Sequence, residues 1–196
     1  LYKFKSKWII KGFIFKDKVY NKVGDNMRKI ERQDFIKAIE ELCLDANFEL
    51  SKKVLRLLVD SRETEESPVG KKILDQILEN ADLAKNEKLP MCQDTGIVVA
   101  FLEVGKVEFD FDLYKATNEG ISRAYEKGYL RKSVVKSPID RVNTGDNTPA
   151  IIHTKIVEGS KIKMKIASKG AGSENMSLVK MLTPAEGIAG IKQLVV

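Results

Sequence analysis

A thiol, an amide, a carboxylate and a hydroxyl occupy four consecutive positions near the middle of the chain, at Cys92, Gln93, Asp94 and Thr95. Pro90 restricts the backbone before this quartet, and Gly96 relaxes it afterwards. The apolar residues 97–102 follow at once, and a short run rich in β-branched side chains predicts a buried strand. The sequence therefore predicts a polar loop held at the start of a core strand, where it could carry chemistry.

Two side chains of this loop each have two possible roles. The Cys92 thiolate could be a metal ligand, since thiolates from separate loops hold iron–sulfur clusters. The alternative is a partly buried structural thiol. Asp94 could transfer a proton, or it could accept backbone N–H groups in an Asx turn. The two roles of Asp94 are compatible.

Two further polar loops, residues 141–150 and 168–175, adjoin the strand-like runs 151–157 and 161–167. Asn143 and its neighbours in the first loop suit turn building and hydrogen bonds that orient other groups. In the second loop, glycines could let backbone N–H groups approach an anion, or the loop could simply connect two strands. It lacks the spacing of a Walker phosphate loop.

Arg131 and His153 are single candidates outside these patterns. A guanidinium suits a bidentate carboxylate, although the sequence alone favours a surface arginine at a helix end for Arg131. His153 is the only histidine and could titrate near neutral pH. It lies in an apolar strand-like run, where a structural histidine is commoner, so we expect it at most to orient other groups.

Together the three loops resemble the N-terminal, or α-subunit, part of the class I fumarases and their relatives the L-tartrate dehydratases, which are iron–sulfur hydro-lyases. The resemblance covers residues 29–196. It implies that Cys92 is one ligand of a 4Fe-4S cluster whose open iron acts as a Lewis acid. Two further ligands are expected outside this chain, because Cys43 matches neither family position.

The resemblance also implies roles for other residues. Gln93 and Asp94 would face the substrate, Asp94 would be catalytic, Arg131 would clamp a substrate carboxylate, and Gly172 would line the site. Residues expected to support these groups are Thr95, Asn143, Asp146, His153 and Lys169.

The activity that the resemblance implies is the reversible hydration of fumarate to (S)-malate, a small dicarboxylate reaction. An L-tartrate dehydratase α subunit is the alternative within the class, and a non-catalytic assembly subunit is the alternative outside it. A β subunit or C-terminal domain would complete the site, in a homo- or hetero-oligomer. We expect this chain by itself to be inactive.

The first third of the chain is predicted to be helical. A first helix has an apolar stripe at helical spacing, and its members are Phe35, Ile36, Ile39, Leu42 and Cys43. We expect Cys43 to be a buried thiol on this stripe. Ser51 can cap a second helix, and Ser67 with Pro68 can open a third, in which Ile73, Ile77 and Leu78 would be buried.

A fourth helix is predicted from Asp112 as its cap, continuing past Gly128, with Gly120 weakening it slightly. Thr183 and Glu186 have the spacing of a capping box, so a last helix would turn Ile188, Ile191 and Leu194 inward. Residues 194–196 are typical of a strand, and we expect the chain to be part of a longer protein.

These elements predict an α/β fold, with α+β as the alternative: a helical N-terminal part followed by a mixed sheet with interleaved helices. Residues 1–26 form a leader that we expect to lie outside the fold. Residues 27–196 would form the N-terminal domain of an iron–sulfur hydro-lyase, truncated at its C-terminus.

Composition narrows the class of protein. The net charge is +6, but the leader holds seven Lys and two Asp, which leaves +1 for the other residues. We therefore expect no nucleic-acid partner. No apolar run reaches the length of a membrane span, so no membrane association is expected. Two cysteines and no secretion signal favour the reducing cytoplasm.

Overall fold

The computed structural model describes residues 16–19, 28–170, 172 and 178–195. In chain order its elements are β1 (Lys16–Val19), β2 (Arg28–Lys29), α1 (Arg32–Phe48), α2 (Lys52–Thr64), α3 (Pro68–Glu87), β3 (Ile97–Val104), β4 (Val107–Glu108), α4 (Leu113–Lys127), β5 (Ile151–Ile156), β6 (Ile162–Lys169), the 3₁₀ turn η2 (Pro184–Glu186) and α5 (Gly187–Val195).

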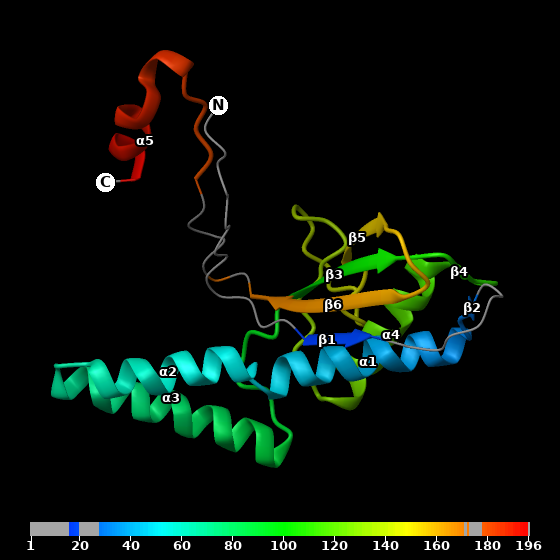
Figure 1. Cartoon of the computed structure of the whole chain (residues 1–196), viewed down its shortest axis with the longest axis horizontal. Helices are drawn as coiled ribbons and strands as arrows, with labels where there is room; N and C mark the ends of the chain where they lie inside the picture. The colour runs from blue at the N-terminus through cyan, green and yellow to red at the C-terminus, as the bar shows by residue number, and fades with distance from the viewer. Residues whose placement is uncertain (1–15, 20–27, 171, 173–177, 196) are drawn as a thin grey trace.

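Four strands form a mixed sheet in the order β1-β6-β3-β5 (Figure 1). β3 and β5 are parallel and are connected through α4, whereas β6 is antiparallel to both β1 and β3. The short strands β2 and β4 pair separately and in parallel. The predicted α/β class, with a helical first third before a mixed sheet, is confirmed.

Helices α1 and α4 cover one face of this sheet and enclose the core. Side chains alternate between the faces of a strand, and the inward ones on β3 and β6 are buried. Every residue of the predicted α1 stripe is buried, including Cys43. On α4, Ile121 and Tyr125 fill the space opposite.

Gly120 lets α1 and α4 approach closely. A Cβ atom at this position would lie 2.8 Å from the Ile36 carbonyl oxygen and 2.8 Å from the Ile39 Cβ. The low helix propensity of glycine is therefore offset by the packing of the two helices.

The predicted N-caps are confirmed. The hydroxyls of Ser51 and Ser67 accept from Val54 N and Gly70 N, and Asp112 accepts from two N–H groups of the first α4 turn. The prediction that the α4 helix continues past Gly128 is wrong. It ends in a Schellman motif, in which Leu130 N donates to Tyr125 O and Tyr129, at φ 50°, adopts the left-handed conformation.

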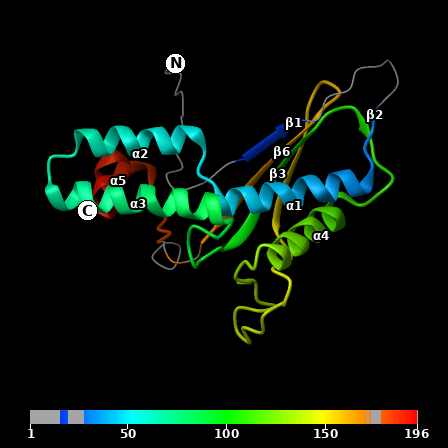
Figure 2. The same cartoon turned by 90° about the horizontal axis from the view of Figure 1, so that it is seen from below.

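Helices α2 and α3 form a hairpin that projects away from the sheet (Figures 1 and 2). The burial predicted for its apolar face is wrong: Ile73 is 51% exposed and Ile77 is also exposed, while Leu78 is half-buried. The physical reason is that α2 and α3 shield only the side chains between them. The outer stripe has no covering element in the described part of the chain.

The capping box of the last helix is confirmed, because Glu186 accepts from both the Thr183 N–H and the Thr183 hydroxyl. The inward orientation predicted for its apolar residues is wrong. Ile188 is 72% exposed and Ile191 is exposed, since α5 stands apart from the sheet and packs mainly on η2 (Figure 1). Leu194 and Val195 are helical rather than extended.

Most of the predicted leader falls outside the described residues, but β1 belongs to it and pairs with β6. The domain boundary after residue 26 stays a prediction. Within the described ranges, no helix combines the length and the apolar composition that a membrane crossing requires.

Candidate functional site

The strand register brings the three polar loops to one edge of the sheet. Ile97, the first residue of β3, pairs with Lys169, the last residue of β6. Val99 pairs with Ile151, the first residue of β5. The beginnings of β3 and β5 and the end of β6 therefore lie together. We name the segments at this edge the Cys92 loop (residues 89–96), the Asn147 loop (residues 141–150) and the Gly170 loop (residues 169 and 170).

The Cys92 and Gly170 loops are in backbone contact. Gly96 has φ +66°, and a Cβ atom there would lie 2.2 Å from the Lys169 carbonyl oxygen. A Cβ atom on Gly170 would lie 3.0 Å from Oδ2 of Asp94. Close approach of the backbone therefore requires a glycine at position 96, whereas a side chain at position 170 would crowd the Asp94 carboxylate.

Asp94 forms the predicted Asx turn. Its Oδ1 accepts from the backbone N–H of Gly96 at 3.2 Å, while Oδ2 faces Gly170. The side chain is half-buried. The carboxylate is therefore oriented by its own loop with one oxygen directed toward the neighbouring loop.

Two hydroxyl groups attach the Cys92 loop to its surroundings: Thr95 binds the segment after α4, and Tyr125 binds the loop from α4 itself. The Thr95 hydroxyl donates to the carbonyl oxygen of Arg131 at 2.7 Å. The Tyr125 hydroxyl donates to the carbonyl oxygens of Thr95 and Gly96, at 2.6 and 3.2 Å. Burial raises the pKa of Tyr125, so its hydroxyl stays protonated and remains a donor at neutral pH.

The Asn147 side chain also links the Cys92 loop to the segment after α4. It is 0% exposed, and its Nδ2 donates to the carbonyl oxygen of Gly96 at 3.1 Å. Its Oδ1 accepts from the N–H groups of Ser133 and Val134, at 2.6 and 3.2 Å. The sequence did not single out Asn147, because nothing in its sequence neighbourhood distinguishes it from Asn143.

Asn143 and Asp146, the two residues that the sequence predicted in this loop, make most of their hydrogen bonds to backbone groups in and near the loop. Asn143 donates to the Lys132 carbonyl oxygen and accepts from Gly145 N. Asp146 accepts from the Thr148 N–H and hydroxyl, at 2.9 and 2.8 Å. Partial burial opposes ionisation of Asp146, but hydrogen bonds from Thr148 outweigh it and hold its pKa below the usual value.

His153 lies outside this cluster. It faces solvent on the edge strand β5 and stacks on Phe101 with ring centroids 5.1 Å apart. Its partner Phe101 is four residues along β3 from Ile97, about 13 Å at the usual rise per residue. The expectation of an enclosed apolar strand is therefore wrong, since within the described part of the chain β5 pairs with a strand on one side only and most of its residues are exposed.

Lys169 and Gly172 continue from the end of β6. The Lys169 ammonium donates to the carbonyl oxygen of Gly170 at 3.1 Å. Gly172 is exposed, and a Cβ atom there would meet nothing within 4 Å. Crowding among the described residues therefore does not demand a glycine at this position.

Cys92, Gln93 and Arg131 all have exposed side chains at the loop edge. The Cys92 loop is anchored at its start, because Met91 N donates to Asn47 O and Asn80 Nδ2 donates to Met91 O, both at 3.0 Å. An accessible thiol on an anchored loop fits one thiolate ligand of a cluster. The described residues offer no second such ligand, since Cys43 is sealed in the core and burial raises its pKa.

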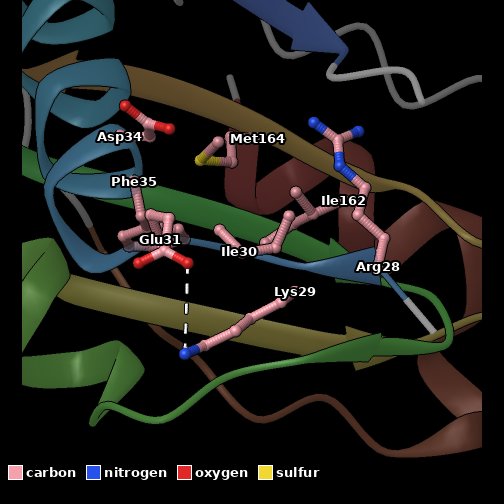
Figure 3. A pocket seen from close by; sticks show the side chains of 8 residues that line it. All are labelled: Arg28, Lys29, Ile30, Glu31, Asp34, Phe35, Ile162 and Met164. Atoms are coloured by element: carbon pink, nitrogen blue, oxygen red, sulfur yellow. Dashed lines mark ion pairs between the residues drawn. The ribbon is translucent and has the colours of Figure 1, made fainter. Parts of the chain in front are cut away.

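Acidic, cysteine and histidine side chains do not gather elsewhere in the described ranges into a group of three that could hold a metal ion. A small cavity of about 70 Å³ lies between β2, the start of α1 and the start of β6, lined by residues that include Glu31, Phe35 and Met164 (Figure 3). Lys29 reaches Glu31 across its mouth at 4.0 Å. This cavity lies at the opposite end of β6 from Gly170.

Comparisons with known proteins identify the family of this chain. The family described as fumarate hydratase (Fumerase) matches residues 36–196. A putative L(+)-tartrate dehydratase subunit alpha from Methanocaldococcus jannaschii is 37% identical over 166 residues, covering 80% of this chain and 58% of that protein.

Two Escherichia coli proteins are also similar. The L(+)-tartrate dehydratase subunit alpha of strain UTI89 is 26% identical over 86% of this chain and 58% of its own length. The aerobic class I fumarate hydratase of strain K12 is 32% identical over 83% of this chain and 30% of its own length. The chain thus spans little more than half the length of the tartrate dehydratase subunits, and less of the fumarase. Its match to the family extends over most of its residues, and the chain belongs to the fumarate hydratase (Fumerase) family.

Proposed function

We propose that this chain is the cluster-binding part of a hydro-lyase that reversibly hydrates fumarate to (S)-malate. The observation that supports this most strongly is that the Cys92, Asn147 and Gly170 loops meet at one edge of the sheet, where Asp94 lies beside Gly170 and Asn147 binds Gly96 O. An accessible thiol, an oriented carboxylate and an arginine then occupy one edge of the sheet. These groups could respectively hold a cluster iron, transfer a proton and bind a substrate carboxylate.

Arg131 binds one carboxylate of the substrate in this proposal. Its backbone is held by the hydrogen bond from Thr95, while its side chain is exposed at the loop edge. A guanidinium presents two parallel N–H donors to a carboxylate, which fixes the orientation of the bound molecule as well as its position. Gln93 adds an amide, and Gly172 lies on the loop opposite.

Asp94 holds or moves the proton, or orients the hydroxyl that adds to the double bond. Its Oδ1 accepts from Gly96 N, and its Oδ2 lies beside Gly170. A substrate carbon placed beside Oδ2 would lie within reach of proton transfer. Thr95, Asn143, Asp146 and Lys169 keep the loops in place around it, and we propose no direct role for His153.

Cys92 would hold one iron of a 4Fe-4S cluster. When bound, such a cluster supplies a Lewis acid that polarises the hydroxyl entering or leaving the substrate. The other two thiolates would come from elsewhere in the whole protein, because Cys43 is enclosed by α1 and α4. A C-terminal domain or β subunit would complete the site, and the oligomer would operate in the reducing cytoplasm.

L-tartrate dehydratase activity is the second candidate. Two of the similar proteins are named as subunit alpha of that enzyme, and one of them is 37% identical to this chain. Fumarate and L-tartrate are both four-carbon dicarboxylates, so one arginine clamp could serve either. A subunit without catalytic activity is the remaining alternative.

The test uses the full-length protein with its partner, reconstituted anaerobically with iron and sulfide. Fumarate and L-tartrate are assayed side by side on wild type, Cys92→Ser and, as a matched control, Cys43→Ala. We expect Cys92→Ser to lose cluster iron and turnover, and Cys43→Ala to keep both after allowance for stability. Preference for tartrate would change the substrate and leave the proposed site in place. Full activity and iron content in Cys92→Ser would refute the proposal.

A further inference from the structure

Asn147 is a buried polar side chain at the edge of the sheet where the three loops meet, and it makes hydrogen bonds to two separate segments. Its amide nitrogen donates to Gly96 O, in the loop before β3. Its amide oxygen accepts from the N–H groups of Ser133 and Val134, which are two and three residues after Arg131. One side chain therefore fixes the distance between the loop that carries Asp94 and the segment that carries Arg131.

A second connection makes this link rigid in orientation as well as in distance. The Thr95 hydroxyl donates to Arg131 O at 2.7 Å, next to the link through Asn147. One contact alone would let the Arg131 segment pivot about it. The two links involve the adjacent residues Thr95 and Gly96 on one side and residues 131–134 on the other, so together they remove that freedom. The Tyr125 hydroxyl holds the Thr95 and Gly96 carbonyls from α4.

The chemistry at this position suits asparagine in particular. The backbone of Asn147 has φ +61°, a left-handed conformation that Asn and Asp adopt more readily than most residues. The site requires one donor toward Gly96 and an acceptor for two N–H groups, and a neutral amide offers both. An aspartate would keep the backbone and the acceptor, but it would place a carboxylate oxygen against the Gly96 carbonyl.

We infer that Asn147 is a positioning residue of the enzyme, setting the Arg131 guanidinium relative to Asp94 and Cys92 without contacting the substrate. The inference rests on the function proposed above. It extends that function, because it assigns the geometry of the carboxylate clamp to a buried amide in a third loop. Mutation of a group that orients the ligands of a metal site typically lowers activity by about 10- to 100-fold, and we expect a loss of the same order here.

The experiment compares Asn147→Asp with wild type in the full-length, cluster-loaded enzyme with its partner. Iron content, the Kd of the unreactive dicarboxylate succinate, kcat and KM are measured. We expect iron content to stay at the wild-type level, and kcat/KM to fall about 10- to 100-fold with weaker succinate binding. Ile162→Ala, a buried change at the far end of β6, serves as the stability-matched control and should leave kcat/KM within about twofold.

A double-mutant cycle with Arg131→Lys separates positioning from general destabilisation. If Asn147 acts through Arg131, the effects of Asn147→Asp and Arg131→Lys will be non-additive by threefold or more, whereas Ile162→Ala will combine additively with Arg131→Lys. Additive effects in both cycles would overturn the inference. If Asn147→Asp fails to fold, Asn147→Gly, which removes the amide and suits the left-handed backbone at this position, takes its place in the cycle.

The two proposals fail in distinguishable ways. A wild-type enzyme that is loaded with iron and turns over neither fumarate nor L-tartrate would overturn the proposed function, and the inference with it. An active wild type whose Asn147→Asp variant, or Asn147→Gly in its place, matches the Ile162→Ala control would overturn the positioning role alone.

Discussion

The hydroxyl of Thr95 donates to the carbonyl oxygen of Arg131 at 2.7 Å, across 36 residues of sequence. This contact joins the loop that precedes β3 to the segment that follows α4. Thr95 is buried, so loss of its hydroxyl would leave the Arg131 carbonyl with less than its full hydrogen bonding. The contact therefore contributes both to stability and to the placement of the arginine.

We predict that Thr95→Val lowers the free energy of unfolding by about 1 kcal/mol, the typical net contribution of one hydrogen bond. Urea unfolding of the metal-free protein measures this. Thr154→Val on the exposed strand β5 is the control and should change stability by less than about 0.5 kcal/mol. Equal effects of the two substitutions would show that the Thr95 contact contributes nothing.

Gly96→Ala should be much more damaging, because it combines two penalties. The residue has φ +66°, and the added methyl would lie 2.2 Å from Lys169 O. We expect a loss of about 3 kcal/mol or more, from left-handed strain plus overpacking.

The matched control for Gly96→Ala is Gly159→Ala. Gly159 has φ +97°, but a Cβ atom there would meet nothing within 4 Å. Only the backbone strain remains, so a loss of about 1–2 kcal/mol is expected. Chemical unfolding of both variants separates the cost of the clash from the cost of the backbone strain. A Gly96→Ala variant as stable as Gly159→Ala would contradict the close approach of the Cys92 and Gly170 loops.

The two cysteines should react at very different rates in the metal-free protein. Cys92 is exposed, whereas Cys43 is fully buried and burial raises the pKa of its thiol. Because the thiolate is the reactive form, Cys43 stays protonated and unreactive at neutral pH. Alkylation with iodoacetamide followed by peptide mass spectrometry should label Cys92 first, and Cys43 only after denaturant is added. Comparable rates without denaturant would mean that the α1–α4 core is open.

Asp146 should add a pH-dependent contribution to stability. Its folded-state pKa is lowered, with the Thr148 hydrogen bonds outweighing partial burial. A carboxyl group with a lowered pKa contributes stability that is fully present above its unfolded value, 3.8, and that is lost as the pH falls through the folded value. Thermal unfolding from pH 7 to pH 3 should therefore show wild type more stable than Asp146→Asn near neutrality. That advantage should shrink below pH 3.8, and an advantage that grew on acidification would have the wrong sign.

The sequence by itself determined the local structure of this protein. Serine and aspartate caps begin α2, α3 and α4 because their side chains accept from N–H groups within the next three residues, and Glu186 reaches back to Thr183 at η2. The apolar stripe of α1 and the alternation of β6 predict their buried faces, since both depend only on the period of the element. The polar quartet before β3 was recognisable for the same reason: all its groups are neighbours in sequence.

Only the tertiary structure decided which loops meet. The pairing of Ile97 with Lys169 and of Val99 with Ile151 places residues up to 72 positions apart at one edge, and no local pattern encodes that register. The same holds for Asn147, whose burial depends on two segments packing over it. The apolar stripes of α3 and α5 were predicted to be buried but are exposed. Amphipathic spacing predicts which face of a helix could be buried, but burial itself requires another element to cover that face.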